Sequence, residues 1–428
     1  MKLQFGPVSS HAELDALVAS APLPEPLQMA AWAQVKAGEW QAQRYGIYAD
    51  GELVGAYQLL IRRLPVVPLR IAYSSRGPVF SKPVPPDYYV QVARHMERTA
   101  RAHRAIVLHY DPPVRRCHGR ELYRRLRARG YAHLGFHFDM REIQPRCAMM
   151  LELPGHAEDI EAALSKKLRQ RIRRAAKRPF VISQVDSAGL AEFSALMQAM
   201  AKRQQIAMRG ESYYRRILEA FGPNAEACVI SLDRKATLDE LEDTLRAQER
   251  ELESATTSAE RARSQAKQRA ARRRIEQAER VIEKTKAARD ELEGLTRDLL
   301  PLACSLIITC GKRAFYIYGA SGNELRDYGA VYVLLADRMR HLVDSHGGPV
   351  LFDFGGVSGQ TDASKDPDHG GLFEFKSKWG AEMVEFVGEF VKPTVPGIGH
   401  LFVHATRAYK KGRDLRHRLA RHERKGER

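Results

Sequence analysis

Residues 238–295 read LDELEDTLRAQERELESATTSAERARSQAKQRAARRRIEQAERVIEKTKAARDELEGL, and this stretch decides how the whole chain is organised. All but its last two residues belong to a longer segment, Asn224 to Glu293, that contains neither glycine nor proline. The spacing predicts an antiparallel helical hairpin that turns between Ser254 and Ser264. Its apolar residues recur at alternating steps of three and four, as in a coiled coil. They are Leu238, Leu241, Leu245, Leu252 and Ala255 in one series, and Ile275, Ala278, Ile282, Leu292 and Leu295 in a second.

The middle of this segment is strongly basic. Cations clustered toward the turn of a hairpin suit contact with nucleic-acid phosphates. A structural or dimerising coiled coil explains the same pattern, because charged residues also form its solvated face. The sequence leaves both interpretations open, and it leaves the oligomeric state open as well. The cations are Arg261, Arg263, Lys267, Arg269, Arg272, Arg273 and Arg274.

Globular patterns lie on both sides of the hairpin. Before it, the helical segment YYVQVARHMERTARAHR precedes a β-rich run at residues 105–113 that Asp-Pro-Pro ends. After it, SLIITCGKRAFYIYGASG predicts two strands that turn at Gly311 and Lys312, and a helix follows up to His346. The mixture predicts an α+β fold. The hairpin is therefore expected as an insertion within a globular domain.

The charge balance indicates a polyanionic partner. The chain of 428 residues carries 69 Lys and Arg against 52 Asp and Glu, a formal charge of +17. Such an excess favours nucleic acid or anionic lipid headgroups, although a generally basic composition would give the same total. The densest run, LSKKLRQRIRRAAKR at residues 164–178, contains eight cations and no acidic residue. A solvated helix face is one interpretation of this run. Contact with an anion is the other, because eight cations with no acid between them cannot all find a partner within the helix.

Cysteine usage and hydropathy indicate the compartment. Five cysteines without Cys-x-x-Cys spacing predict a reduced protein, and no group of histidines and carboxylates has metal-ligand spacing. Neither a metal nor a cofactor is expected. The first residues lack the apolar core of a signal peptide, and the most apolar run, Leu299 to Cys310, is shorter than the roughly 20 residues that span a bilayer. We expect a cytoplasmic protein whose substrate can lie at the inner face of the membrane.

The segment DFGGVSGQTDASKDPDHGGLFEFKSKWG, residues 353–380, places a glycine-rich loop before a lysine among aromatic residues. Lys376 follows Phe375 in a second predicted loop. An ammonium held there can stabilise an oxyanion or a phosphate, and a solvated surface lysine is the alternative. A GxSxG elbow, a GxxxxGK[ST] loop and the pyrophosphate loop of coenzyme-A acetyltransferases are absent from the sequence. Elsewhere, Arg209 and Tyr213 are four residues apart, so a helix would place them on one face.

Taken together, these stretches resemble the Fem family of non-ribosomal aminoacyltransferases over roughly residues 27–390. The motifs occur in family order: LQMAAWAQVKAGEW, YSSRGPVF, VLHYDP, IQPR, the basic run, YIYGASGNELR, FDFGGVSG and GLFEFKSKWG. The resemblance implies two acetyltransferase-like domains with a substrate cleft between them. It also implies a coiled-coil arm similar to the tRNA-binding arm of seryl-tRNA synthetase. The implied boundaries are 1–148 joined by 381–428 for the first domain, 149–235 with 299–380 for the second, and 236–298 for the arm.

The matched motifs imply roles for single residues. One group would hold the diphosphate of a nucleotide-linked or lipid-linked acceptor and line its cleft: Lys36, Arg209, Tyr213 and Tyr318. Lys376, ordered by Phe375, would meet the aminoacyl end of a tRNA. Asp111 matches an aspartate of the family, and the resemblance places it with Lys376 and Phe375 among the catalytic residues. The hairpin cations would contact the tRNA.

The activity that the resemblance implies is transfer of an amino acid from aminoacyl-tRNA to the stem-peptide amine of a peptidoglycan precursor. That precursor is either UDP-MurNAc-pentapeptide or lipid II. An ester is already activated, which agrees with the lack of a Ser, Cys or His nucleophile constellation. Lys376 would stabilise negative charge on the tetrahedral oxyanion or the departing ribose oxygen.

Two alternatives remain at this point. A coenzyme-A-dependent N-acyltransferase would share the fold but take a different donor. A non-catalytic RNA-binding coiled-coil protein would explain the charge and the hairpin. The basic tail from Ala405 would add a loose contact to tRNA or to the membrane, or would simply be disordered.

Overall fold

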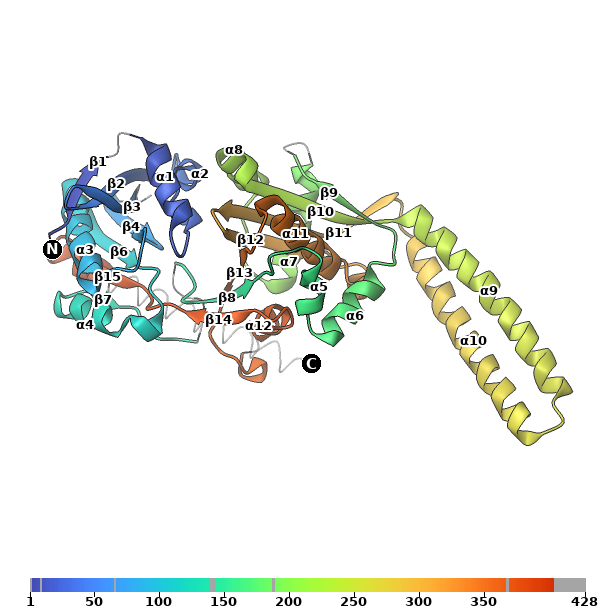
Figure 1. Cartoon of the computed structure of the whole chain (residues 1–428). Helices are drawn as coiled ribbons and strands as arrows, with labels where there is room; N and C mark the ends of the chain where they lie inside the picture. The colour runs from blue at the N-terminus through green and yellow to red at the C-terminus, as the bar shows by residue number, and fades with distance from the viewer. Residues whose placement is uncertain are drawn as a thin grey trace.

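The computed structural model describes residues 2–7, 10–64, 67–138, 140, 143–186, 189–366 and 369–403. Two mixed β-sheets with helices against them form the body, and a long helical hairpin projects from the second sheet (Figure 1). The predicted α+β fold with an inserted antiparallel hairpin is confirmed. The basic tail from Ala405 lies outside the described residues.

The first sheet has the strand order β1-β2-β3-β4-β6-β15-β7, and β5 pairs with β3. Helices α3 (Pro86–Ala102) and α4 (Arg120–Ala128) pack on one face, and α1 (His11–Ser20) packs in a separate apolar cluster with β3. The strands are β1 (Gln4–Pro7), β2 (Gln41–Ala49), β3 (Glu52–Arg63), β4 (Arg70–Ser75), β5 (Val79–Phe80), β6 (Ala105–Asp111), β7 (Ala132–His133) and β15 (Phe390–Pro393). The short helices are η1 (Pro26–Gln28), α2 (Ala30–Lys36) and η2 (Arg116–His118).

The second sheet has the order β14-β8-β13-β12-β11-β10-β9. Its strands alternate between two cores: Ile307 packs with α11 (Ala330–His346), whereas Leu306 and Ile308 pack with α7 (Leu190–Gln204) and α8 (Glu211–Phe221). The strands are β8 (Cys147–Glu152), β9 (Phe180–Gln184), β10 (Ala225–Asp233), β11 (Leu299–Cys310), β12 (Arg313–Ser321), β13 (Leu351–Val357) and β14 (Glu382–Glu385). The remaining helices are α5 (Asp159–Ala163), α6 (Lys166–Ala175), η3 (Gly222–Asn224), η4 (Arg326–Tyr328), η5 (Ala363–Lys365) and α12 (Gly370–Ser377).

The hairpin consists of α9 (Arg234–Arg261) and α10 (Gln265–Glu293). It is inserted between β10 and β11, which are antiparallel neighbours and pair up to Asp233 and Leu299. The Asp233 side chain accepts a hydrogen bond from the Ala236 amide at 2.9 Å and begins α9. The Ser264 hydroxyl caps α10 in the same way. The turn at residues 262–264 lies within the predicted window, and small residues such as Ala255 let the two helices approach closely.

One parallel strand pair in the second sheet separates early. β12 pairs with β13 only from Arg313 to Phe315, and β13 then follows β8 with an irregular register between Asp353 and Gly356. The expected glycine-rich loop is therefore wrong in part, because Gly355 and Gly356 belong to β13. A Cβ on Gly356 would lie 2.2 Å from Pro145 Cγ, so close backbone approach explains this glycine.

The chain passes between the sheets twice. The first passage precedes β8, and the return occurs after β14, which still pairs with β8 in the second sheet. The expected return to the first domain at residue 381 therefore comes later, between β14 and β15. The chain stays in the second domain for longer than expected because β14 pairs with β8 at the edge of the second sheet.

Candidate functional site

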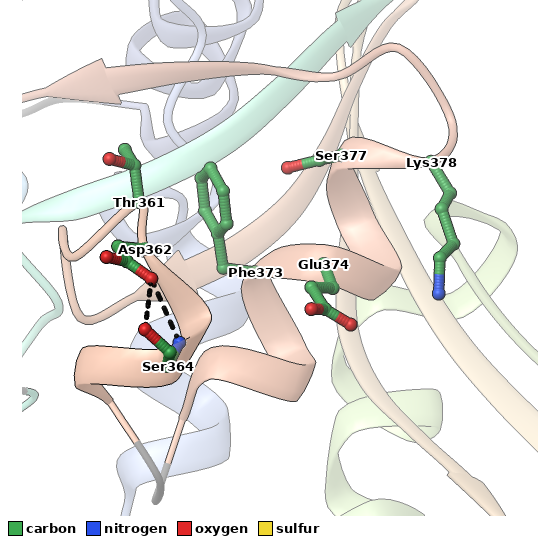
Figure 2. Close-up of a pocket in the computed structure, with 7 residues that line it drawn as sticks. All are labelled: Thr361, Asp362, Ser364, Phe373, Glu374, Ser377 and Lys378. Carbon is green, nitrogen blue, oxygen red and sulfur yellow. Dashed lines mark hydrogen bonds between the residues drawn. The ribbon is translucent and has the colours of Figure 1, made fainter.

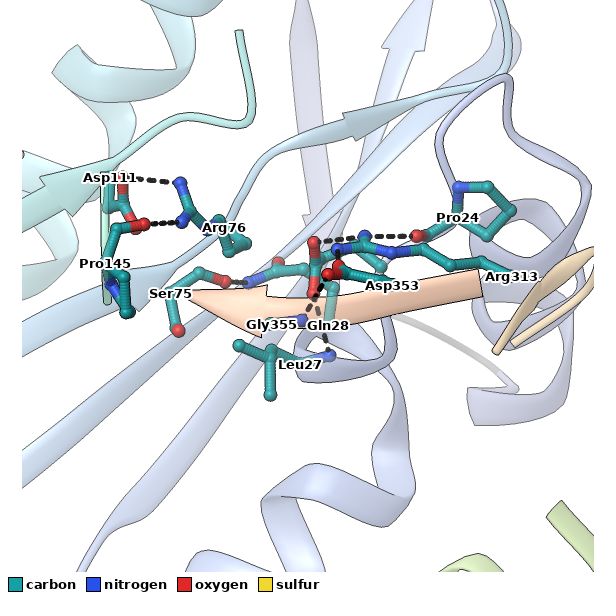
Figure 3. Close-up of polar contacts among 11 residues, drawn as sticks. Pro24, Leu27, Gln28, Ser75, Arg76, Asp111, Pro145, Arg313, Asp353 and Gly355 are labelled. Carbon is teal, nitrogen blue, oxygen red and sulfur yellow. Dashed lines mark hydrogen bonds and ion pairs between the residues drawn. The ribbon is translucent and has the colours of Figure 1, made fainter. Parts of the chain in front are cut away.

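A buried ionic joint holds the two sheets together (Figure 3). The Arg313 guanidinium is 3% exposed; its Nη1 donates to Glu25 Oε2 at 2.7 Å, and its Nη2 donates to Asp353 Oδ2 at 2.5 Å. Asp353 Oδ1 accepts from the Gly355 amide at 2.7 Å. A buried arginine is tolerated because two carboxylates neutralise it. The joint thus fixes β13 relative to the segment that leads into α2.

Asp111 lies in a second part of the joint. Arg76 Nη1 is 3.4 Å from Asp111 Oδ1, and the same guanidinium donates to the Pro145 carbonyl (Figure 3). The Phe386 ring lies 4.1 Å below that guanidinium. Pro145 and Phe386 belong to the two passages between the sheets. Asp111 therefore has the contacts of a residue that orders the joint.

The acceptor residues predicted from the motifs meet where α2 packs against α8. The Lys36 ammonium donates to the Tyr213 hydroxyl at 2.8 Å and lies 4.6 Å from the centre of the Trp32 ring. The Arg209 and Arg216 guanidinium groups lie 4.9 and 5.5 Å from the centre of the Tyr213 ring. Arg209 precedes α8 and is not on its face, so the expected helical pair is wrong, although the two side chains still meet.

The charges of this cluster are not balanced. Burial and the neighbouring Arg209 lower the pKa of Lys36 to about 8. Arg216 and Arg62 act in the same direction, and Glu39 alone opposes them. Tyr318 lies against Tyr213 with the ring centres 6.3 Å apart, and burial raises the pKa of both phenols. Crowded cations beside neutral hydroxyl donors are an arrangement that suits an anion.

Lys376 has a different environment. It lies on α12 and not in a loop, and it is 4% exposed, so both the predicted loop and the solvated-lysine alternative are wrong. Its ammonium donates to the Gly356 carbonyl at 2.7 Å. Burial lowers the pKa of Lys376 to about 7, and the Asp353 carboxylate opposes that shift. A lysine that exchanges its proton near neutral pH is suited to catalysis.

Aromatic residues enclose α12. Phe375 packs on Tyr332 with ring centres 5.6 Å apart, and Trp379 lies 6.1 Å from both Tyr332 and Phe354. Phe375 therefore helps to seat the helix that carries Lys376. This apolar wall also explains why the amine of Lys376 loses hydration.

A cavity of about 550 Å³ opens beside α12 (Figure 2). Its lining combines one aromatic ring with hydroxyls, two carboxylates and one ammonium. Asp362 is held by the amide and the hydroxyl of Ser364 at 3.1 and 2.6 Å and pairs with Lys365 at 3.1 Å. The cavity is open to solvent and presents the Phe373 ring beside the Glu374 carboxylate and the Lys378 ammonium. The lining residues are Thr361, Asp362, Ser364, Phe373, Glu374, Ser377 and Lys378.

The predicted tRNA-binding cations are exposed near the end of the hairpin that lies away from the sheets (Figure 1). Arg274 pairs with Glu251 at 2.7 Å across the two helices. In the described part of the chain the other six have no ion pair: Arg261, Arg263, Lys267, Arg269, Arg272 and Arg273. The hairpin thus presents free positive charge far from Lys376.

Helical spacing would have found some residues that the motif reasoning did not assign. Trp32 is four residues before Lys36, and Arg216 is three residues after Tyr213, so both share a helix face with a predicted residue. The sequence gives no sign that the Gly356 carbonyl accepts a hydrogen bond from Lys376, because a backbone acceptor cannot be recognised from a side chain.

Metal ligands and buried thiols give no candidate site in the described ranges, and Cys117 is an exposed thiol. No group of three His, Cys, Asp or Glu there could hold a metal ion. Burial raises the pKa of Cys228, Cys304 and Cys310 to about 12, which makes these thiols poor nucleophiles. None of the described helices has the length and apolar character needed to cross a membrane.

Comparisons with known proteins agree with this geometry. Residues 10–402 match the FemAB family model. Lipid II:glycine glycyltransferases of Staphylococcus haemolyticus (strain JCSC1435) and Staphylococcus aureus (strain MRSA252) are 28% and 30% identical over 394 residues, covering 89% of this chain and 91% of each relative. The crystal structure of FemX is similar with a TM-score of 0.69 and 29% identity, over 91% of this chain and 97% of FemX, which confirms the predicted fold. The chain belongs to the FemAB family.

Proposed function

We propose that this protein is an aminoacyltransferase that moves an amino acid from aminoacyl-tRNA to the stem-peptide amine of a peptidoglycan precursor. The observation that carries the proposal is the pair of lysine sites in a FemAB chain: a cation cluster at Lys36 for an anionic acceptor, and a buried amine at Lys376 for the reacting centre. The named activity of the staphylococcal relatives supports the acceptor class.

The acceptor diphosphate would bind at the Lys36 cluster. Arg209 can engage two phosphate oxygens at once, whereas Lys36 supplies a point charge and the Tyr213 hydroxyl a neutral donor. An incoming anion also relieves the repulsion between Lys36 and Arg209. Both UDP-MurNAc-pentapeptide and lipid II carry a diphosphate, so this chemistry serves either one. A lipid-linked acceptor would bring the protein to the membrane surface.

The reaction needs no covalent enzyme intermediate. The uncharged acceptor amine attacks the ester carbonyl carbon, a C–N bond forms, and the bond to the tRNA ribose oxygen breaks. The amine loses a proton, and the leaving ribose oxygen gains one. Protonated Lys376 would stabilise the oxyanion that appears between these events, a task that is strongest in a buried site.

The donor would approach from the α12 side. Phe373 would offer a face for the terminal adenine, and the Glu374 carboxylate would suit the ammonium group of the amino acid. The exposed hairpin cations would contact phosphates on the body of the tRNA. Asp111 would act by ordering the joint between the sheets, since Arg76 is its partner.

The direct test mixes the purified protein with tRNA charged with radiolabelled amino acids and with UDP-linked pentapeptide or lipid II. Label should appear in the precursor, disappear after RNase treatment of the donor, and fall sharply in Lys376→Met. Transfer of label from acetyl-CoA without tRNA would identify an N-acyltransferase instead. No transfer from a complete charged-tRNA pool to either acceptor, together with retained RNA binding, would identify a non-catalytic RNA-binding protein.

A further inference from the structure

The basic helix α6 remains without a role in the site described above. Its apolar residues Leu168, Ile172 and Ala175 are buried, and Leu168 and Ile172 belong to the core that also contains Tyr332 and Trp379. Cations cover much of the remaining surface of the helix and of the residues that follow it. The exposed ones are Lys166, Lys167, Arg173, Arg174 and, just beyond the end of α6, Lys177. We call these five residues the α6 face.

Acids neutralise little of this face. Glu161 on α5 lies 2.9 Å from Arg173 and also binds Arg340 at 2.6 Å, so its charge is shared. Among the described residues, no other member of the α6 face has an ion pair. The face therefore presents a net positive surface on the second domain.

Two arginines at the edge of the face are stacked on tyrosines. The Arg171 guanidinium lies 4.2 Å from the centre of the Tyr332 ring, and Arg178 lies 4.4 Å from the centre of the Tyr328 ring. Stacking fixes each guanidinium plane while its N–H groups stay available to an acceptor. Arginine and aromatic residues interleaved in this way are typical of surfaces that bind RNA.

The same tyrosine leads to the reacting centre. Tyr332 contacts both Arg171 and Phe375, and Phe375 is the residue before Lys376. A polyanion that lies along α6 would thus end close to α12. From this continuity we infer that the α6 face binds the phosphates of the amino-acid-bearing arm of the donor tRNA; the inference rests on the proposed function.

A membrane surface fits the α6 face less well. Helices that lie in a bilayer interface insert large exposed apolar residues beside their cations. The apolar residues of α6 are already consumed by the protein core, and the helix has no exposed large hydrophobic residue. Because the α6 face carries positive charge but no apolar residues that could insert into a bilayer, it suits the phosphate backbone of a nucleic acid better than a membrane surface.

The test is a double variant, Arg174→Gln/Lys177→Gln, in the otherwise intact chain. Unacylated tRNA binding is measured by fluorescence anisotropy between ~50 and 200 mM salt. The dissociation constant should rise about 5- to 30-fold, and the slope of log K against log salt should fall by about 1 to 2, as expected for two lost phosphate contacts. Arg174→Lys/Lys177→Arg keeps both charges and should bind tRNA within about twofold of the wild type.

A matched control removes the same charge elsewhere. Arg94 and Arg98 are exposed on α3 of the first domain, so Arg94→Gln/Arg98→Gln should leave tRNA binding unchanged. Equal losses in both double variants, or no loss in the α6 variant, would overturn the inference. Lost binding to phosphatidylglycerol vesicles with intact tRNA binding would assign the face to the membrane instead.

Transfer assays separate this inference from the proposed function. With aminoacyl-tRNA the α6 variant should lose kcat/KM in parallel with affinity, whereas with aminoacyl-adenosine, which lacks the tRNA body, it should match the wild type. If the wild type and the α6 variant transfer from aminoacyl-tRNA at equal rates, the inference about the α6 face is wrong, whereas the proposed function is still supported. If the wild type transfers from neither donor, the proposed function fails, and the anisotropy data alone decide the α6 face.

Discussion

Lys36 and Lys376 are both withdrawn from water and both have a lowered pKa, yet the causes differ. At Lys36, burial acts together with the positive charge of Arg209. At Lys376, burial acts against the negative charge of Asp353. At the first site several cations face Glu39 alone, so a bound anion would relieve their repulsion. The second already has a carboxylate nearby and a carbonyl partner in Gly356.

This difference suggests a division of labour. A bound anion would relieve the repulsion between the cations of the Lys36 cluster, so these residues should govern the affinity for a charged acceptor. The enclosed amine of Lys376 can carry charge only at a cost, so it should govern the chemical step. The variants below test whether the two sites separate in this way.

The largest expected effect is the loss of Lys376. In Lys376→Met, kcat should fall about 10²- to 10³-fold with little change in KM for the acceptor, because the lost charge acts mainly on the oxyanion. Initial rates at saturating donor measure it. Lys312→Met, an exposed lysine in the same domain, serves as the control and should retain full activity. A raised KM with a normal kcat in Lys376→Met would contradict the proposed division, because Lys376 would then act on affinity and not on the chemical step.

The next effect is the loss of Lys36. In Lys36→Met, KM for the UDP-linked acceptor should rise about 10- to 100-fold, since a hydrogen-bonded charge is removed, while kcat should change little. Steady-state kinetics with varied acceptor provide the measurement. Lys82→Met, an exposed lysine of the first domain, should behave like the wild type. An unchanged KM would mean that the anion binds elsewhere.

Stability should respond in the opposite direction to activity. Because the pKa of Lys376 is lowered on folding to about 7, the unfolded state binds more protons, and stability rises with pH from about 7 toward 10.5. At pH ~6 Lys376 is protonated and the full cost of burying its charge is present. The free energy of unfolding of Lys376→Met should therefore exceed that of the wild type by about 2–4 kcal/mol. Denaturant unfolding at pH ~6 and ~10 should show this gain shrinking at the higher pH. A constant difference would exclude the buried charge as its cause.

The smallest effect is in the pH profile. At saturating substrates, log kcat of the wild type should rise while the acceptor amine, with a pKa of ~10.4, loses its proton. It should level off above about pH 7, where Lys376 loses the charge that stabilises the oxyanion. In Lys376→Arg the guanidinium stays charged, so the curve should keep rising. A wild-type curve without the break would argue against the protonated amine as the active form.

The hairpin and the lysine sites show which features could be predicted from the sequence and which could not. The hairpin was predictable because coiled-coil spacing is local and the segment has no helix breaker, and Ser264 even marks where α10 begins. The motifs predicted Lys36, Arg209 and Tyr213 as one group, and the structure brings them together, although Arg209 lies outside the helix on which the spacing placed it. Lys376 was predicted as a catalytic residue in a loop, whereas it lies buried on a helix. Short segments such as α12 have weak local preferences, so packing against β13 decides them.

The sequence by itself determined the class of the fold, the inserted hairpin, the excess of positive charge and the resemblance to a family. These follow from periodicity, composition and motif order, which act over short stretches of chain. Only the tertiary structure decided that Asp111 joins the Arg76 part of the interdomain joint, that Gly356 offers its carbonyl to Lys376, and that Arg171 reaches Tyr332. Each depends on residues far apart in sequence, because burial and electric fields are properties of the folded surroundings and not of the residue itself.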